Sequence, residues 1–215
     1  MLSNFLRKIL SLLSFWSLND LSSIKSRDEK ILKIIEKKLN SINKTNKNAS
    51  PWIKNNFEKI AKNSLILDLA CGSGRHSILA KQLGFTVIAT DINYKKLFFL
   101  KKTKDIKVIQ TDLEKKYNWP FKKNIFDAVI VTNYLYRPLF KNIFYSIKPK
   151  GFLLYETFTL ENKQFGRPYN LNYLLKPREL LDLALDYEIS VIEYEEIITH
   201  YIKPKAIQRI LGKIK

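Results

Sequence analysis

Three acidic residues accompany three short apolar segments of the chain, and a glycine-rich turn follows the first of them. Asp68 precedes Gly72 and Gly74, while Asp91 and Asp112 follow two further apolar runs. Glycines in such a turn allow backbone N–H groups to approach a ligand closely. A carboxylate repels phosphate but accepts hydrogen bonds from an ammonium or a hydroxyl group. This combination predicts a site for a nucleoside-like ligand that lacks a pyrophosphate.

The glycine turn also permits two other interpretations. Starting at Gly72, the pattern G-x-G-x-x-G has Ser77 in its third position, and Asp91 follows at close to the spacing of about 20 residues found in dinucleotide sites. A glycine-rich turn that merely connects a strand to a helix is the other alternative. The turn by itself does not decide among the three.

The elements that must position these residues alternate along the chain. Apolar runs predict parallel strands, buried on both faces, over 65–69, 85–90, 108–111, 126–132 and 151–157, with a helix over 77–83. A helix over 178–186 and two strands over 189–193 and 206–211 complete the order, and the last two strands fit an antiparallel hairpin. The pattern predicts an α/β fold with a doubly wound sheet, in which ligands bind at the carboxyl ends of the strands.

The ordered motifs resemble those of the class I S-adenosylmethionine-dependent methyltransferases over about residues 50 to 211. The motifs are Asp68-x-Ala70-x-Gly72-x-Gly74, then Asp91, then Asp112-Leu113, then the segment 127–134. The run DLACGSGRH over 68–76 is similar to the bacterial tellurite-resistance and thiopurine methyltransferase-like group. The resemblance implies a Rossmann-like doubly wound seven-stranded sheet with an antiparallel terminal hairpin.

The resemblance also implies that the cofactor is S-adenosylmethionine, and it assigns residues to parts of that cofactor. Ala70 stands where the family motif has its first glycine, and Asn133 is expected near the transferred methyl group. The expected contacts are Asp68, Gly72, Gly74 and Arg75 with the methionine part, Asp91 with the ribose, and Asp112 and Leu113 with the adenine; Ala70, Ile92 and Asn133 complete the set.

Catalytic residues are harder to predict, because methyl transfer mainly requires an acceptor held in line and shielded from water. Tyr136 is a candidate for orienting the acceptor, and Arg137 is a candidate for binding an anion. Glu156 lies inside an apolar strand, so it is either a site residue or the partner of a cation such as Arg167. The long connection 158–176 predicts a lid that includes Arg167 and Tyr169, and ordinary loop packing is the alternative.

The motifs also narrow the class of acceptor. Asn133 is followed by Tyr-Leu-Tyr rather than the Pro-Pro-Tyr of base-amino methyltransferases, which disfavours that reaction. Methylation at carbon 5 of a pyrimidine needs a cysteine nucleophile, and the single cysteine, Cys71, lies in the glycine turn. A small-molecule acceptor is therefore predicted. An RNA or protein acceptor and a non-catalytic cofactor-binding protein are the alternatives.

Composition bears on partners and location. The net charge of +18 suggests RNA, but 31 lysines outnumber 7 arginines, which indicates a coding bias more than phosphate recognition. His76 and His200 lie far apart without further ligands at metal-binding spacing, so no metal site is predicted. A single cysteine and the lack of a long apolar run predict a cytoplasmic protein. The sequence does not predict an oligomeric state.

The amino-terminal part predicts a separate unit. Residues 1–48 are expected to form a helical extension and linker, and residues 49–215 the methyltransferase domain. Residues 1–18 are apolar apart from a few polar residues and the pair Arg7 and Lys8, and they predict a helix that packs on the domain. Weak contact of this helix with a membrane surface is the alternative, and export is disfavoured.

Overall fold

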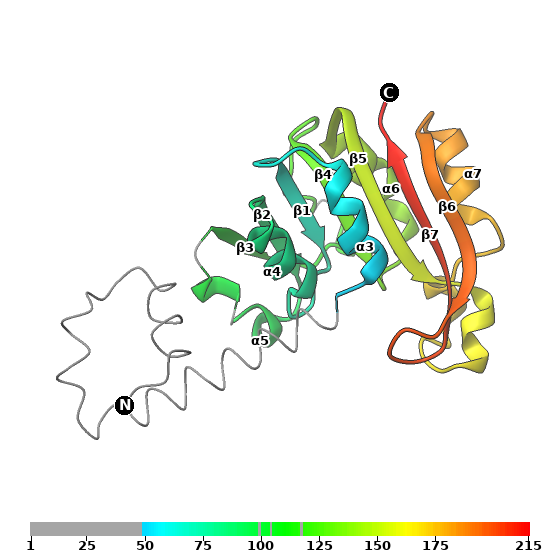
Figure 1. The fold of residues 1–215 in the computed structure, drawn as a ribbon. Helices are drawn as coiled ribbons and strands as arrows, with labels where there is room; N and C mark the ends of the chain where they lie inside the picture. Colours follow the sequence, from blue (N-terminus) through cyan, green and yellow to red (C-terminus); the bar gives the residue numbers. More distant parts are fainter. Residues whose placement is uncertain (1–48, 99, 104, 117) are drawn as a thin grey trace, which may run out of the picture. The chain divides into compact units, whose positions relative to one another are not determined.

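A computed structural model describes residues 49–215 apart from positions 99, 104 and 117. The predicted extension and linker over 1–48 therefore lie outside the described residues. A seven-stranded sheet in the order β3-β2-β1-β4-β5-β7-β6 organises the described part of the chain (Figure 1). Among the described residues, no helix has the length and apolar character needed to cross a lipid bilayer.

The sheet combines a parallel part with an antiparallel end. The strands β1 to β5 pair in parallel, whereas β7 is antiparallel to both β5 and β6. The strands are β1 (Leu65–Leu69), β2 (Thr86–Asp91), β3 (Ile106–Gln110), β4 (Phe126–Thr132), β5 (Ile147–Phe158), β6 (Ser190–Thr199) and β7 (Lys205–Lys213). This order confirms the predicted doubly wound fold with its antiparallel terminal hairpin.

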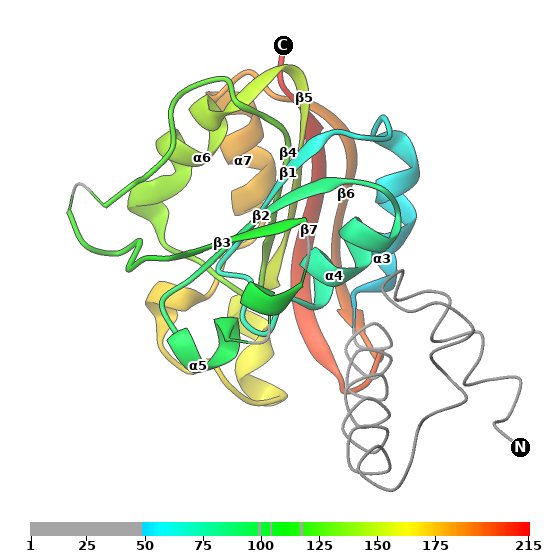
Figure 2. The same ribbon diagram turned by 90° about the vertical axis from the view of Figure 1, so that its left-hand side faces the viewer.

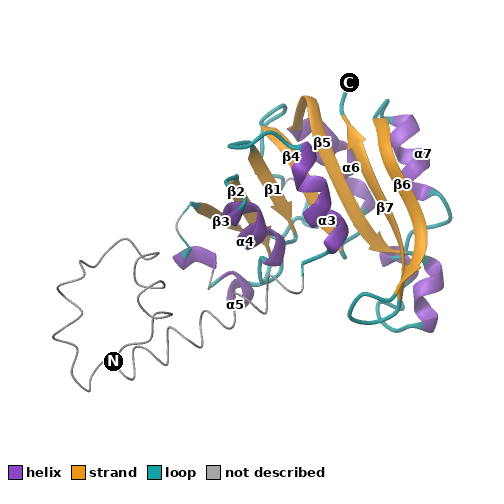
Figure 3. Cartoon of the chain, viewed as in Figure 1, coloured by secondary structure: helices purple, strands orange, loops and turns teal. Residues whose placement is uncertain are grey.

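Helices cover both faces of the sheet (Figures 2 and 3). One face packs against α3 (Pro51–Asn56) and α4 (Arg75–Gln82), and the other packs against α6 (Phe140–Ser146) and α7 (Glu179–Asp186). The short helix α5 (Tyr94–Leu97) follows β2. Neighbouring residues of one strand serve opposite faces: Ile66 packs on the α3 and α4 side, and Leu67 on the α6 and α7 side. Burial on both faces is the reason that the central strands are mostly apolar in sequence.

The observed bounds of β5 and β6 differ most from the prediction, and the difference has a physical explanation. β6 extends to Thr199 rather than 193; it is an edge strand in which no position is fully buried and which includes several glutamates. β5 begins at Ile147 rather than 151, and its register with β4 shifts between Phe126 and Ala128. Neither feature produces the continuous apolar run by which a buried strand is predicted.

Candidate functional site

The loop between β1 and α4 has a backbone conformation that favours glycine. The φ angles of Ala70, Gly72 and Gly74 are 51°, 60° and 77°. A Cβ atom on Gly74 would lie 2.3 Å from Cδ1 of Leu100, whereas a Cβ on Gly72 would meet nothing within 4 Å. The loop thus leaves open space beside Gly72, and the left-handed φ of Ala70 accounts for the glycine that the family motif has there.

Asp68 is the penultimate residue of β1 and lies close to this loop in the chain. Its Oδ2 atom accepts hydrogen bonds from the backbone N–H of Ser77 at 2.9 Å and from the Ser77 hydroxyl at 2.5 Å. Its Oδ1 atom is buried without a hydrogen bond to any residue that the structure describes. Burial raises the pKa of Asp68 to about 6. The free oxygen can accept a hydrogen bond from a cationic ligand group, which would favour the ionised form.

Asp91, at the end of β2, is joined to the loop. Its Oδ2 accepts a hydrogen bond from the Gly72 backbone N–H at 2.7 Å, and its Oδ1 accepts one from the Asn93 backbone N–H at 2.8 Å. The next side chain, Ile92, is 59 % exposed. A carboxylate beside an exposed aliphatic side chain suits a ligand that has both hydroxyl groups and a flat apolar part, as a nucleoside does.

The residues after β3 differ in what they can offer a ligand. Asp112 is partly exposed, and its Oδ1 accepts a hydrogen bond from the backbone N–H of Glu114 at 3.1 Å. The side chain of Leu113 is buried in the core on the α6 and α7 side of the sheet. A contact between Leu113 and an adenine ring would therefore have to come from its backbone.

Asn133 and the tyrosines that follow β4 differ in their exposure and in their hydrogen bonds. Asn133 is exposed with a φ of 53°, and its backbone N–H donates to the carbonyl of Glu156 at 2.9 Å. The Tyr134 hydroxyl is buried with no hydrogen bond to a described residue, and burial raises the pKa of Tyr134. The Tyr136 hydroxyl donates to the backbone carbonyl of Glu114 at 3.2 Å. Tyr136 therefore braces the loop after β3.

Arg137, a candidate for binding an anion, already has a protein partner. Its guanidinium forms a bidentate ion pair with Glu179, with Nε at 2.6 Å from Oε1 and Nη2 at 2.8 Å from Oε2. It also donates to the carbonyls of Asn172 and Leu174 at 2.9 and 3.0 Å. Arg137 thus fastens the connection before α7 to the segment after β4, and most of its donors are used for this purpose.

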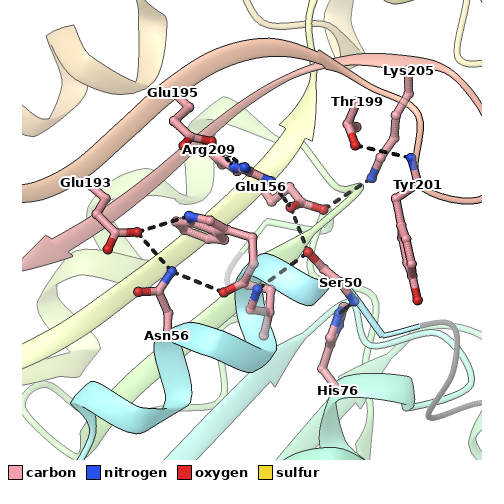
Figure 4. A network of polar contacts seen from close by, with 12 residues as sticks. Ser50, Asn56, His76, Glu156, Glu193, Glu195, Thr199, Tyr201, Lys205 and Arg209 are labelled. Atoms are coloured by element: carbon pink, nitrogen blue, oxygen red, sulfur yellow. Dashed lines mark hydrogen bonds and ion pairs between the residues drawn. The ribbon is translucent and has the colours of Figure 1, made fainter.

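Glu156 lies at the centre of a polar network, and its cationic partners differ from the expected Arg167. Its Oε2 accepts a hydrogen bond from the Ser50 hydroxyl at 2.8 Å, and its Oε1 accepts one from the Lys205 ammonium at 3.2 Å (Figure 4). Arg209 approaches Oε2 to 3.8 Å. The antiparallel register places Arg209 opposite Glu156 across β5 and β7. Glu156 is buried, and these partners satisfy the need for compensation of its charge.

His76 belongs to the same network, in a role that the sequence did not reveal. Its Nε2 accepts a hydrogen bond from the backbone N–H of Ser50 at 3.1 Å, so the proton of the neutral ring is on Nδ1, which lies 3.3 Å from the Thr132 hydroxyl. Burial lowers the pKa of His76 to about 3. The sequence signal for this network is Ser50-Pro51, a typical helix start, which anchors α3 to the sheet.

A pocket of about 420 Å³ opens beside Glu156. It brings together four of the predicted site residues, namely Arg75, Asn133, Glu156 and Arg167, whereas Tyr136 and Arg137 do not line it. Ser50, Lys203 and Lys205 line it as well, and sequence reasoning missed all three. The remaining lining residues are Phe158, Asn162, Phe165, Gly166, Tyr201, Ile202 and Pro204. Within the described part of the chain, no three His, Cys, Asp or Glu residues are grouped to hold a metal ion.

Comparison with known proteins gives one family match and one curated relative. Residues 66–151 match the family model described as a methyltransferase domain. The putative methyltransferase YqeM of Bacillus subtilis is 30 % identical over 118 residues, which is 49 % of this chain and 47 % of YqeM. The chain thus spans about half the length of this curated relative.

Solved structures share the fold at low sequence identity. TehB from Haemophilus influenzae has a TM-score of 0.64 at 22 % identity, over 78 % of this chain and 63 % of TehB. An S-adenosylmethionine-dependent methyltransferase from Aquifex aeolicus has a TM-score of 0.57 at 18 % identity, over 81 % of this chain and 98 % of that protein. At these identities the structures establish the arrangement of the strands and not the reaction.

Proposed function

We propose, on the premise that this chain contains a class I S-adenosylmethionine-dependent methyltransferase domain, that the protein transfers the methyl group of that cofactor to a small molecule. The observation that carries the proposal is the junction of the glycine loop with Asp91, which lies next to a pocket lined by Arg75 and Asn133. Cofactor-binding groups and an acceptor-sized pocket thereby share the carboxyl edge of the sheet.

The residues at this edge fit each part of the cofactor. The buried free oxygen of Asp68 suits the methionine ammonium, and Arg75 suits the methionine carboxylate. Asp91 suits the ribose hydroxyls and the exposed Ile92 suits a face of the adenine ring. Asp112, Leu113 and the backbone around Gly72 complete the proposed cofactor site. When bound, the cofactor supplies an electrophilic methyl group on a sulfonium, whose sulfur is a good leaving group.

The protein's own contribution is to position the acceptor and exclude water. The pocket volume of about 420 Å³ falls within the range of about 300 to 1,000 Å³ that is typical of small-molecule sites. Glu156 supports the pocket through its bonds to Ser50 and Lys205, which come from two distant parts of the chain. This support keeps the lining in one arrangement, and positioning is the main requirement of a direct methyl transfer.

Two measurements test the proposal in sequence. Calorimetry with S-adenosylmethionine and, separately, with NAD tests the cofactor; binding of NAD together with no binding of S-adenosylmethionine would refute the proposal. Transfer of a labelled methyl group in a cell extract then identifies the acceptor class, after separation into small molecules, RNA and protein. Label in the small-molecule fraction is the expected result.

An RNA acceptor is the second candidate, and a specific surface favours it. A depression of about 440 Å³ is lined by Trp119, Phe121 and Tyr145 and by three lysines, Lys122, Lys123 and Lys141. Aromatic side chains beside cations are typical of surfaces that bind single-stranded nucleic acid. Label confined to RNA would establish this candidate.

Cofactor binding without label in any fraction would instead favour a non-catalytic protein.

A further inference from the structure

We propose that the methyl acceptor carries an anionic group, which Arg167 and Lys203 bind, and an apolar body, which the aromatic part of the pocket contacts. The inference rests on the proposed function and names the chemical class of its substrate. Small organic carboxylates and phosphate monoesters share this chemistry.

The charges that line the pocket favour an anion. The lining includes four cationic residues, Arg75, Arg167, Lys203 and Lys205, and a single acidic one, Glu156. Lys205 already forms an ion pair with this carboxylate at 3.2 Å, and Arg209 approaches its other oxygen. Glu156 therefore does not neutralise the remaining three cations of the lining.

Two of these cations remain for the acceptor. Arg75 is the group proposed for the methionine carboxylate, whereas Arg167 and Lys203 form no ion pair with any residue that the structure describes. The contrast with two other arginines is clear, because Arg137 is paired with Glu179 and Arg209 with Glu195. Arg167 and Lys203 thus retain their charge for a ligand.

Arg167 and Lys203 line the same pocket, and a buried asparagine of its lining joins the segments on either side. Arg167 follows the 3-10 helix Leu160–Gln164, and Lys203 lies in the connection between β6 and β7. The side-chain amide of Asn162 donates to the carbonyl of Arg167 at 3.2 Å, and its Oδ1 accepts a hydrogen bond from the backbone N–H of Ala206 at 3.2 Å. Asn162 is 2 % exposed. One side chain therefore joins the Arg167 segment to Ala206 at the start of β7, three residues after Lys203 in the chain.

The rest of the lining suits an apolar body. Phe158 is partly buried, and the side chains of Phe165 and Ile202 are 37 % and 63 % exposed. Binding of a ligand that covers exposed apolar side chains is favourable, because it removes apolar surface from water. A molecule with a flat or aliphatic body and one negative group matches this combination, whereas an inorganic ion would leave the apolar part uncovered.

A matched pair of probes tests the inference. Calorimetry is performed with the full chain saturated with S-adenosylhomocysteine, using 3,4-dihydroxybenzoate and catechol, which differ only in the carboxylate. We expect the benzoate to bind at least about tenfold more tightly, which corresponds to about 1.4 kcal/mol. In the double variant Arg167→Gln and Lys203→Gln, the two probes should bind equally.

The controls separate this inference from the proposed function. Lys123→Gln removes a lysine from the other depression and should leave the preference for the benzoate unchanged. Unchanged affinity of the double variant for S-adenosylhomocysteine shows that it is folded. Equal binding of the two probes to the unmodified protein, or no binding of the benzoate, overturns the inference. Failure of S-adenosylhomocysteine to bind overturns the proposed function. If the protein still binds the benzoate more tightly than catechol in that case, the result supports the anion site alone.

Discussion

The carboxylate of Asp91 accepts a hydrogen bond from the backbone N–H of Gly72 at 2.7 Å, and this bond ties the end of β2 to the loop after β1. The residue proposed for the ribose therefore also holds the loop proposed for the methionine. A change at Asp91 acts on both, so binding of the cofactor and the conformation of the loop are coupled.

Asp91→Asn should weaken cofactor binding strongly. The substitution removes the negative charge and one of the two acceptor oxygens, and a hydrogen bond to a charged group contributes about 1.5 to 3 kcal/mol. We expect the Kd for S-adenosylhomocysteine to rise by about 10- to 100-fold in calorimetry. Asp105→Asn is the matched control, because Asp105 is an exposed partner of Lys81 on the surface. Equal effects of the two substitutions would contradict the assignment of Asp91.

Cofactor binding should depend on the protonation of Asp68. Burial raises the pKa of its carboxyl to about 6, and a ligand ammonium binds the ionised form. Below about pH 6, binding must first remove a proton from Asp68, so affinity should fall by up to about tenfold per pH unit. Calorimetry with S-adenosylhomocysteine between pH 5 and about 7.5 measures this slope. In Asp68→Asn, the pH dependence of the affinity that is due to this carboxyl should vanish. Persistence of the same pH dependence would argue against a role of Asp68 in cofactor binding.

The stability of the protein should reflect two opposing titrations. The pKa of His76 is lowered from 6.5 to about 3, so protonation of the unfolded chain removes stability as the pH falls from 6.5 towards 3. The pKa of Asp68 is raised from 3.8 to about 6, so its protonation in the folded state restores stability over the interval from 6 to 3.8. The two effects partly cancel there. Asp68→Asn removes the compensation and should steepen the acid loss, as measured by urea unfolding at a series of pH values. An unchanged pH profile would contradict this account.

Arg137→Lys should destabilise the connection before α7. Lysine retains the charge but cannot form the paired bonds to Glu179 or reach both backbone carbonyls. We expect the free energy of unfolding to fall by about 1 to 3 kcal/mol, since these groups are only partly exposed. Hydrogen exchange should show faster opening around residues 170–180. A variant of full stability that loses only acceptor binding would restore the original hypothesis of an anion-binding arginine.

Ser50 and Glu156 should be energetically coupled. The Ser50 hydroxyl donates to Glu156 and also caps α3, and both residues are buried. Ser50→Ala and Glu156→Gln should each destabilise the fold, and the double variant should lose less than the sum by about 0.5 to 3 kcal/mol. Denaturant unfolding of the four proteins measures this coupling. Strict additivity would show that the contact contributes nothing to stability.

The fold was predictable where burial dictated the sequence. β1 and β4 have the predicted bounds, because strands buried on both faces are mostly apolar. Asp68, Gly72 and Asp91 were predictable for a related reason, since each stands at a strand end or in a turn whose backbone restricts the residue type. Their roles as cofactor ligands remain predictions.

The partners of the candidate catalytic residues were not predictable from local sequence. Lys205 pairs with Glu156 at a sequence separation of 49 residues, and Glu179 pairs with Arg137 at a separation of 42. Such pairs depend on the register of β5 with β7 and on the path of the connection before α7, and neither leaves a local pattern in the sequence. The sequence correctly indicated that Glu156 needs compensation, but it could not identify the side chain that provides it.

The position of β7 between β5 and β6 also constrains the order of folding. β6 precedes β7 in the chain, yet β7 is its neighbour in the sheet, so β6 has no strand to pair with when it leaves the ribosome. Glu156 likewise lacks Lys205 and Arg209 at that moment. Closure of the sheet and neutralisation of its buried acid must therefore follow synthesis of β7, so the lining of the pocket is incomplete until this strand is available.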